Sequence, residues 1–229
     1  MLVCCDKSLH FLGMKQFKPS IVVIGAMDGI SFDGLAGFIR HYQWSGLFVE
    51  PIEYQFNKLK KYYGSLEYVP DNKYENSAIA DFNGEVEMLL IDMAAVERGE
   101  VHPCFGGMST IYPPRNGLAS EGDAEVVSRF GRKIKVPCLT LNALLRKHNI
   151  NHVDVMQLDT EGHDWKIIRQ LDLSLYRPKL IRTEYINLTD QEKSEIIQHF
   201  TAHGYLYEVY GQDVNFVEKH FWNAAQNFQ

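Results

Sequence analysis

The chain has 229 residues, a formal net charge of -6 and a sequence pI near 5.8. This acidic balance argues against a nucleic-acid polymer as partner, because phosphate binding needs a basic stripe and the sequence shows none. No apolar run approaches the roughly 20 residues of a membrane span, so no membrane partner is expected either. The length suits a single domain over residues 1–229 and a small-molecule partner.

The four cysteines, Cys4, Cys5, Cys104 and Cys138, lack paired metal-ligand spacing. Adjacent cysteines rarely bridge each other for geometric reasons. We therefore expect reduced thiols in a cytoplasmic protein. The oligomeric state is not determined by these features.

The most informative segment is the apolar run Ile21–Ile24 with the turn that follows it. An apolar run without alternation is typical of a strand buried on both faces of a parallel sheet. Gly25 and Gly29 follow it and let the backbone approach a ligand closely. A helix is predicted from about Phe32 to Tyr42, which gives the strand–turn–helix order of a nucleotide-binding unit.

A second strand is predicted at Leu47–Glu50, and Pro51 ends it. Glu50 at the end of this strand can accept hydrogen bonds from both hydroxyls of a ribose. The turn Gly25-Ala-Met-Asp-Gly29 lacks the Gly-x-Gly-x-x-Gly spacing of dinucleotide sites, and Asp28 would repel a diphosphate. S-adenosylmethionine, with its cationic sulfonium and amino group, therefore fits better than NAD.

The middle of the chain contains a predicted helix at Phe56–Tyr62 and a turn at Asp81–Gly84, where Asn-Gly favours a hairpin into the strand Val86–Ile91. The third parallel strand is expected just before that turn. From about 94 to 135 the periodicity fails, and this irregular insertion has two interpretations. It is either a substrate lid with Ser109, Tyr112 and Arg115 facing the acceptor, or a disordered surface insertion.

Regular structure is expected to resume with a helix at Leu139–His148 and a buried strand at Val153–Asp159. Asp159 and Glu161 lie two apart, so an extended strand end would direct both carboxylates into the cleft. His163 falls in the first turn of the next helix, where the helix dipole keeps its ring neutral and able to act as a base. The structural alternatives are a helix cap or loop contact for the carboxylates and a structural histidine.

The next strand ends at Glu184, which should lie beside the end of the Asp159 strand. Asp159 and Glu184 could together hold Mg²⁺, because hard oxygen donors suit that cation, or Glu184 could instead bond substrate or a loop. Thr189 and Glu192 form a capping-box pattern. Tyr205–Tyr210 and Asn215–Val217 read as a closing pair of strands, and the aromatic residues after His220 are expected to pack on the sheet.

The segments Val22–Gly29, Phe48–Pro51, Asn76–Gly84 and Gln157–His163 resemble, in order and spacing, the motifs of FkbM-type methyltransferases. The resemblance covers roughly Val22 to Val217. It implies a seven-stranded, Rossmann-like, doubly wound α/β fold that ends in an antiparallel hairpin, and S-adenosylmethionine-dependent methyl transfer, usually to oxygen. The motifs and the reasoning above assign cofactor binding to Gly25, Ala26, Met27, Asp28, Gly29, Ser31, Glu50, Pro51, Asn76, Ser77 and Asp159. Val23 and Gln157 depart from the family, which commonly has an acidic residue and often a lysine there.

Asp159, Glu161 and His163 are the candidate catalytic residues. The favoured function is O-methylation of a hydroxyl on a small molecule such as a sugar or secondary metabolite. A nicotinamide-dependent oxidoreductase shares the ribose-binding acid but is opposed by the glycine spacing and Asp28. A non-catalytic nucleoside-binding module is the other alternative, and there these three residues would be replaceable.

Overall fold

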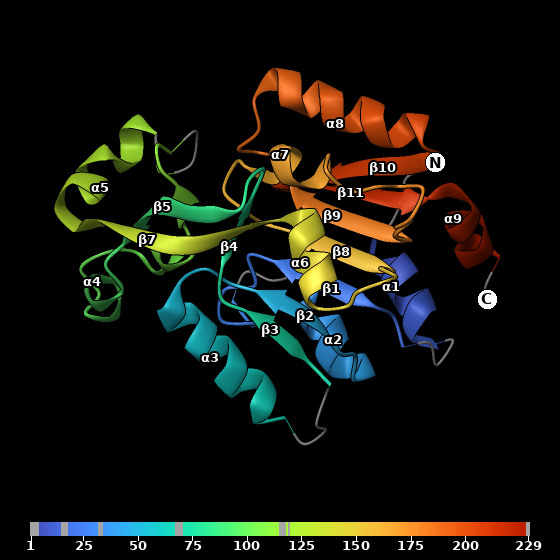
Figure 1. The fold of residues 1–229 in the computed structure, drawn as a ribbon, viewed down its shortest axis with the longest axis horizontal. Coiled ribbons are helices and arrows are strands. Elements are labelled where there is room, and N and C mark those ends of the chain that lie inside the picture. Colours follow the sequence, from blue (N-terminus) through green and yellow to red (C-terminus); the bar gives the residue numbers. More distant parts are fainter. Residues whose placement is uncertain are drawn as a thin grey trace.

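A central sheet with helices on both faces dominates the molecule (Figure 1). The computed structural model describes residues 5–227 except 15–17, 32–33, 67–70, 115–117 and 119. The helices are α1 (Cys5–Met14), α2 (Ala36–Tyr42), α3 (Glu53–Gly64), α4 (Met93–Glu97), α5 (Ala124–Phe130), α6 (Leu141–Lys147), α7 (Asp164–Ile168), α8 (Asp190–Ala202) and α9 (Lys219–Gln226), with 3₁₀ turns η1 (Pro103–Gly106) and η3 (Glu121–Asp123). The strands are β1 (Ile21–Ile24), β2 (Gly46–Val49), β3 (Lys73–Glu75), β4 (Ala78–Ala80), β5 (Gly84–Ile91), β6 (Thr110–Ile111), β7 (Gly131–Thr140), β8 (Val155–Leu158), β9 (Leu180–Glu184), β10 (Tyr205–Tyr210) and β11 (Asp213–Glu218).

The large sheet has seven strands in the order β10-β11-β9-β8-β1-β2-β3. Strands β3, β2, β1, β8 and β9 are parallel, whereas β11 runs antiparallel to both β9 and β10. The chain winds outward from β1 in both directions, so the predicted doubly wound sheet and its C-terminal antiparallel hairpin are confirmed. The carboxyl ends of β1, β2, β8 and β9 consequently meet at one edge, where ligands bind in such folds.

The core forms on both faces of this sheet because β1 and β8 are buried along their whole length. Val22 and Ile24 pack with α6, α7 and α8 on one face. Ile21 and Val23 pack with α1, α2, α3 and α9 on the other, where Trp222 is only 2% exposed. The expectation that the aromatic tail packs on the sheet is therefore confirmed. The Thr189–Glu192 capping box at the start of α8 is confirmed as well.

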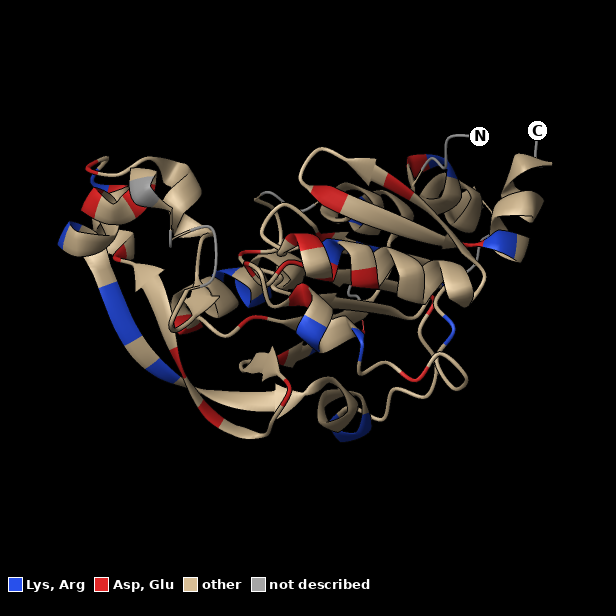
Figure 2. Cartoon of the chain, turned by 90° about the horizontal axis from the view of Figure 1, so that it is seen from above, with Lys and Arg blue, Asp and Glu red and all other residues tan. Residues whose placement is uncertain are grey.

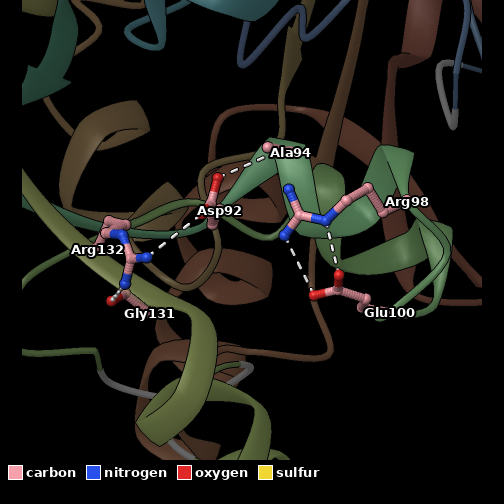
Figure 3. A network of polar contacts seen from close by, with 6 residues as sticks. All are labelled: Asp92, Ala94, Arg98, Glu100, Gly131 and Arg132. Atoms are coloured by element: carbon pink, nitrogen blue, oxygen red, sulfur yellow. Dashed lines mark hydrogen bonds and ion pairs between the residues drawn. The ribbon is translucent and has the colours of Figure 1, made fainter.

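A second, four-stranded sheet in the order β4-β7-β5-β6 lies beside the first. It forms, with α4 and α5, the part on the left of Figure 1. Asp92 accepts the backbone N–H of Ala94 at 3.1 Å and so caps α4, and it also pairs with Arg132 of β7 at 3.3 Å (Figure 3). This contact joins the end of β5 to the start of β7, which pair over eight residue positions.

Three sequence expectations fail around this second sheet. The Asn83-Gly84 turn does not produce a hairpin between its flanking strands, because β7 lies between β4 and β5. Leu139 belongs to β7, so the helix α6 begins only at Leu141, capped by the Thr140 hydroxyl. The segment 94–135 contains η1, β6, α5 and the first half of β7, and is thus more regular than its lack of periodicity indicates.

The helix predicted from Phe32 begins at Ala36 in the structure, and Phe32 itself lies outside the described residues. The delay has a local cause, because the Asp28 carboxylate accepts the backbone N–H groups of Ile30 and Ser31 and holds a tight turn there. In the described part of the chain no helix is long and apolar enough to cross a membrane.

The basic residues of β7 colour much of that strand blue on the left of Figure 2. Arg132 pairs with Asp92 and Lys133 pairs with Glu87 at 3.5 Å. Lys133 also stacks on the ring of Tyr112, with 3.1 Å between Nζ and the ring centroid. This run of positive charge is therefore largely offset by neighbouring acidic and aromatic side chains.

Candidate functional site

A cavity of about 670 Å³ opens at the carboxyl edge of the large sheet. The ends of β1, β2, β8 and β9 form its floor, and residues 104 and 106–109 with Met88 and Ile111 of the second sheet form a wall. Its size falls in the range of about 300–1,000 Å³ that is typical of ligand sites. It brings together most of the residues that the sequence assigns to cofactor and acceptor.

Gly25 makes the turn after β1 possible. Its φ is +79°, and a Cβ at this position would lie 1.9 Å from the carbonyl oxygen of Asp159. The backbone N–H groups of Gly25 and Ala26 both donate to the carbonyl of Val49 at 2.9 Å. The turn is thus pressed against the ends of β2 and β8, and only glycine fits there.

Glu50 follows β2 and is 4% exposed. Its Oε2 accepts the N–H of Met27 at 2.9 Å and its Oε1 accepts the N–H of Ile52 at 2.8 Å. Burial raises the pKa of Glu50 to about 7 against these two bonds, and the charge of Asp28 adds to the rise. Each carboxylate oxygen retains a second acceptor position, so the group can still take ribose hydroxyls as the sequence predicts.

Asp28 is placed differently from the expectation that it meets the cofactor directly. Neither Asp28 nor Gly29 lines the cavity, whereas Met27 and Ser31 do. Burial raises the pKa of Asp28, but hydrogen bonds from the Ser31 and Ile30 backbones and the Ser31 hydroxyl outweigh it and hold the pKa below its usual value. The Asp28 carboxylate therefore stabilises the turn without lining the cavity.

Asn76 and Ser77 also differ in their positions: Asn76 supports the end of β2 from outside the cavity, whereas Ser77 lines the cavity. The Asn76 side-chain amide donates to the carbonyls of Glu50 at 2.8 Å and Pro51 at 3.2 Å, which holds the end of β2 in place, and Asn76 does not line the cavity. Pro51 and Ser77 do line it. The Ser77 hydroxyl is fully buried and has no hydrogen-bond partner among the described residues, so a ligand that enters the cavity can pair with it.

Asp159, Glu161 and Glu184 form a carboxyl cluster, with one oxygen from each lying within 4.8 Å of the others. The sequence predicts this convergence, but the geometry differs from an extended strand end. Glu161 has a φ of +53° and Gly162 one of +92°. A left-handed turn therefore brings the side chains of Asp159 and Glu161 together.

Asn187 and Gly162 hold two members of the cluster. The Asn187 amide donates to Glu161 Oε2 at 2.9 Å and to Glu184 Oε1 at 2.6 Å, and the Gly162 N–H donates to Glu184 Oε2 at 3.1 Å. Burial raises the pKa of Glu161 and of Glu184 well above the ordinary value, and repulsion from neighbouring carboxylates adds to it. Such a cluster binds a proton or a cation more strongly than isolated carboxylates do.

His163 is the one candidate catalytic residue that the cavity does not reach. It precedes α7, is 7% exposed, and is absent from the described cavity lining. The neighbouring Asp164 is fully buried and accepts hydrogen bonds from the hydroxyls of Thr160 at 2.8 Å and Thr183 at 3.0 Å. Asp164 therefore links Thr160, at the start of the turn that carries Glu161, to Thr183 of β9.

The segment interpreted as a lid contributes to the cavity wall. Ser109 lines the cavity, Tyr112 is 40% exposed beside Lys133 and does not line it, and Arg115 lies outside the described residues. Thr110, which the sequence does not single out, donates its hydroxyl to the carbonyl of Glu161 at 3.1 Å. The second sheet is thereby tied to the turn that carries the carboxyl cluster.

Arg182 and Asp213 are two further lining residues that sequence reasoning missed. The guanidinium of Arg182 donates through Nε to Asp213 Oδ2 at 2.9 Å. Arg182 lies in the middle of β9, where a strand pattern predicts only burial, so no local signal could have placed it in the site.

The strand order, the glycine turn and the acidic residue after β2 together define a Rossmann-like methyltransferase fold. The description "Methyltransferase FkbM domain" fits residues 24–207, and the chain belongs to this family. The expected family and fold class are thus confirmed. Methyl transfer is the activity that this family defines.

Several solved structures are similar to the chain, including the three that follow. An FkbM methyltransferase from Methylobacillus flagellatus KT has 11% identity and a TM-score of 0.52, over 87% of this chain and 43% of that one. A putative RNA methyltransferase from Pyrococcus horikoshii has 8% identity and a TM-score of 0.44, over 93% and 80%. A ribosomal protein L11 methylase from Lactobacillus delbrueckii subsp. bulgaricus has 10% identity and a TM-score of 0.40, over 91% and 74%. The chain thus spans less than half of the FkbM structure, and no curated protein matches it.

Proposed function

We propose that this chain is an S-adenosylmethionine-dependent methyltransferase that acts on a hydroxyl oxygen of a small molecule, such as a sugar or secondary metabolite. One observation carries the proposal. A single cavity is lined both by the Gly25 turn with Glu50 and by the cluster of Asp159, Glu161 and Glu184. The proposed nucleoside site and the proposed proton-accepting site therefore share one cavity.

The described residues fit S-adenosylmethionine. Glu50 offers acceptor positions for the ribose, and the buried Ser77 hydroxyl offers a donor and an acceptor. The turn at Gly25 and Met27 brings backbone close to the ligand, with Asp28 and Gly29 completing that turn. When bound, the cofactor supplies an electrophilic methyl group on a cationic sulfur.

Glu161 is the proposed general base. Because its carboxyl is buried among other carboxyls, its carboxylate has a higher proton affinity than an ordinary one and can accept the proton of an acceptor hydroxyl. Asn187 orients this carboxylate through its amide. Asp159 and Glu184 bind the acceptor hydroxyls. His163 is a positioning residue in this proposal, because it directly precedes α7, the helix that anchors the turn carrying Glu161.

A divalent cation such as Mg²⁺ could also occupy the cluster, held by Asp159 and Glu184 with Glu161 as an additional ligand. The carboxyl chemistry fits a hard cation. In that case the cation would displace the shared protons and orient acceptor oxygens. Titration with and without Mg²⁺ separates a metal-dependent from a metal-independent reaction.

The acceptor end favours a neutral or cationic molecule over a nucleic acid. Among the described lining residues, Glu50, Asp159, Glu161, Glu184 and Asp213 are acidic, and the single cation, Arg182, is paired with Asp213. Phosphate groups would meet repulsion there. The thiols of Cys104 and Cys138 form no disulfide with any described residue, which agrees with the cytoplasmic location that we also propose.

Calorimetric titration with S-adenosylmethionine, S-adenosylhomocysteine and NADH tests the cofactor. We expect the two adenosyl ligands to bind and NADH not to bind. An acceptor screen of neutral hydroxylated molecules, read as release of S-adenosylhomocysteine, then tests methyl transfer. Binding of NADH alone would favour an oxidoreductase instead.

Glu161→Gln tests the base. Removing a general base typically lowers turnover by about 10²–10⁴-fold, and we expect a loss of that order with S-adenosylhomocysteine affinity nearly unchanged. Glu125→Gln, an exposed position in α5, is the matched control. Full turnover in the Glu161 variant would indicate another base, and methyl transfer that survives loss of all three carboxyls would remove the cluster from the chemistry.

A further inference from the structure

Gln55 is a buried polar residue of the cavity wall to which the function proposed above gives no role. It lies in the first turn of α3, a few residues after Glu50, and is 3% exposed. Its side-chain amide donates to the carbonyl of Gly106 at 2.9 Å, and the same nitrogen lies 3.8 Å from the sulfur of Met93. Gln55 thus joins the end of β2 to the η1 wall of the cavity.

The contact with Gly106 determines the orientation of the Gln55 amide. A carbonyl oxygen only accepts hydrogen bonds, so the nitrogen must point to Gly106. The amide oxygen Oε1 is then left buried, and no donor reaches it from the described residues. A buried acceptor in a cavity wall without a donor is a site that a ligand donor can satisfy.

Only a few donors on an adenosyl ligand are candidates. We assign the ribose hydroxyls to Glu50, and the amino group of the methionyl part to the place where the Gly25 turn meets Asp159. The exocyclic amino group of the adenine ring is left. The lining of the same cavity includes Gln55 and the apolar residues Pro51, Ala78 and Met108, whose surfaces suit a flat ring.

We propose that Gln55 accepts a hydrogen bond from the exocyclic amino group of adenine, and that this bond makes the cavity select adenosyl over inosyl ligands. The inference rests on the proposed function, because it requires an adenosyl cofactor. An inosyl ligand carries an oxygen in place of that amino group, so it would place an acceptor against the Gln55 acceptor. The selectivity for adenosyl ligands would thus depend on one buried contact, between Gln55 Oε1 and the exocyclic group of the purine ring.

The test is calorimetric titration of the full chain with S-adenosylhomocysteine and S-inosylhomocysteine. We expect the wild type to bind the adenosyl ligand at least about 10-fold more tightly, as for a buried hydrogen bond against a mismatched acceptor. In Gln55→Leu the ratio should fall to about 2 or less, mainly through weaker adenosyl binding. Gln55→Glu keeps an acceptor but cannot donate to Gly106, so it should keep the preference.

Gln170→Leu is the matched control. The Gln170 amide donates to the backbone carbonyls of Ala80 and Lys166, and this residue is absent from the described cavity lining. Its variant should show the wild-type ratio. Melting curves of all variants check that each is folded.

The outcomes separate this inference from the function on which it rests. An equal ratio in the wild type and Gln55→Leu, with S-adenosylhomocysteine still bound, would overturn the role of Gln55 alone. Loss of the preference in both Gln55→Leu and Gln55→Glu would also overturn it, because the contact with Gly106 would then be the cause. If the wild type bound neither ligand, the proposed function would fail and the inference with it.

Discussion

At Gly25, the absence of a Cβ allows the turn after β1 to lie against the end of β8. In Gly25→Ala the new methyl group would meet the Asp159 carbonyl and the residue would have to hold a φ of +79°. We expect a loss of more than about 1 kcal/mol in the free energy of unfolding and at least about a 10-fold loss of S-adenosylhomocysteine affinity. Urea unfolding and calorimetry measure the two effects.

Gly37→Ala is the control for this substitution. Gly37 lies within α2, and a Cβ there would meet no atom within 4 Å among the described residues. Alanine should stabilise the helix by up to about 1 kcal/mol and leave ligand affinity unchanged. If Gly25→Ala behaved like Gly37→Ala, the close approach of the turn to Asp159 would be irrelevant to binding.

Glu50 and Asp159 lie in one cavity but should contribute to different steps. Glu50→Ala removes ribose acceptors and should chiefly weaken cofactor binding. Asp159→Asn keeps the shape of the side chain and should impair methyl transfer more than cofactor binding. Calorimetry and single-turnover rates, measured on the same variants, resolve the two roles. Equal affinity losses in both variants, with turnover otherwise retained, would contradict this division.

At the scale of elements, β6 is tied through one buried hydroxyl to the turn that carries Glu161. Thr110 is 1% exposed and donates to the Glu161 carbonyl. Thr110→Val keeps the shape but removes the donor, at a cost of about 1 kcal/mol or somewhat more. Because Glu161 is held in a left-handed conformation, we expect turnover to fall several-fold while S-adenosylhomocysteine affinity changes little.

Thr201→Val serves for comparison. The Thr201 hydroxyl also donates to a backbone carbonyl, that of Ile197, at 2.7 Å, but on an exposed part of α8. This variant should retain full turnover. Similar rates in the two variants would mean that the tie between β6 and the turn has no influence on the reaction.

Local sequence signals predict the elements of the large sheet well and those of the second sheet poorly. A strand such as β1, buried on both faces, has an unbroken apolar run that a short window detects. The partner of β5 is β7, which follows about 40 residues later, beyond any local pattern. The Asn83-Gly84 signal is consequently misleading, because turn chemistry specifies a reversal but not which strand fills the space beside it.

The same distinction holds for the site in the whole molecule. Gly25, Glu50 and the Asp159–Glu161 pair follow strand ends, and the fold class alone predicts that such positions converge. Gln55 and Thr110 each bond a residue 51 positions away in the sequence, and neither stands in a motif. Their roles follow from how the second sheet lies against the first, which only the folded chain shows.

Buried carboxyl groups make the stability of the whole molecule depend on pH. Burial raises the pKa of Glu50 from 4.5 to about 7, so between these values the folded chain binds more protons than the unfolded chain. The free energy of unfolding must therefore fall as the pH rises through this window, by up to about 3 kcal/mol for this group. The raised pKa values of Glu161 and Glu184 act with the same sign.

Glu50→Gln isolates the contribution of Glu50, because the amide does not titrate. Urea unfolding from about pH 4 to pH 8 should show that the wild type loses stability relative to this variant as the pH rises, with most of the change below and around pH 7. The variant also loses one acceptor for the N–H groups of Met27 and Ile52, which shifts its curve by a roughly constant amount. Parallel curves for the two proteins would show that Glu50 titrates normally when folded, and its burial beside Met27 would then not raise its pKa.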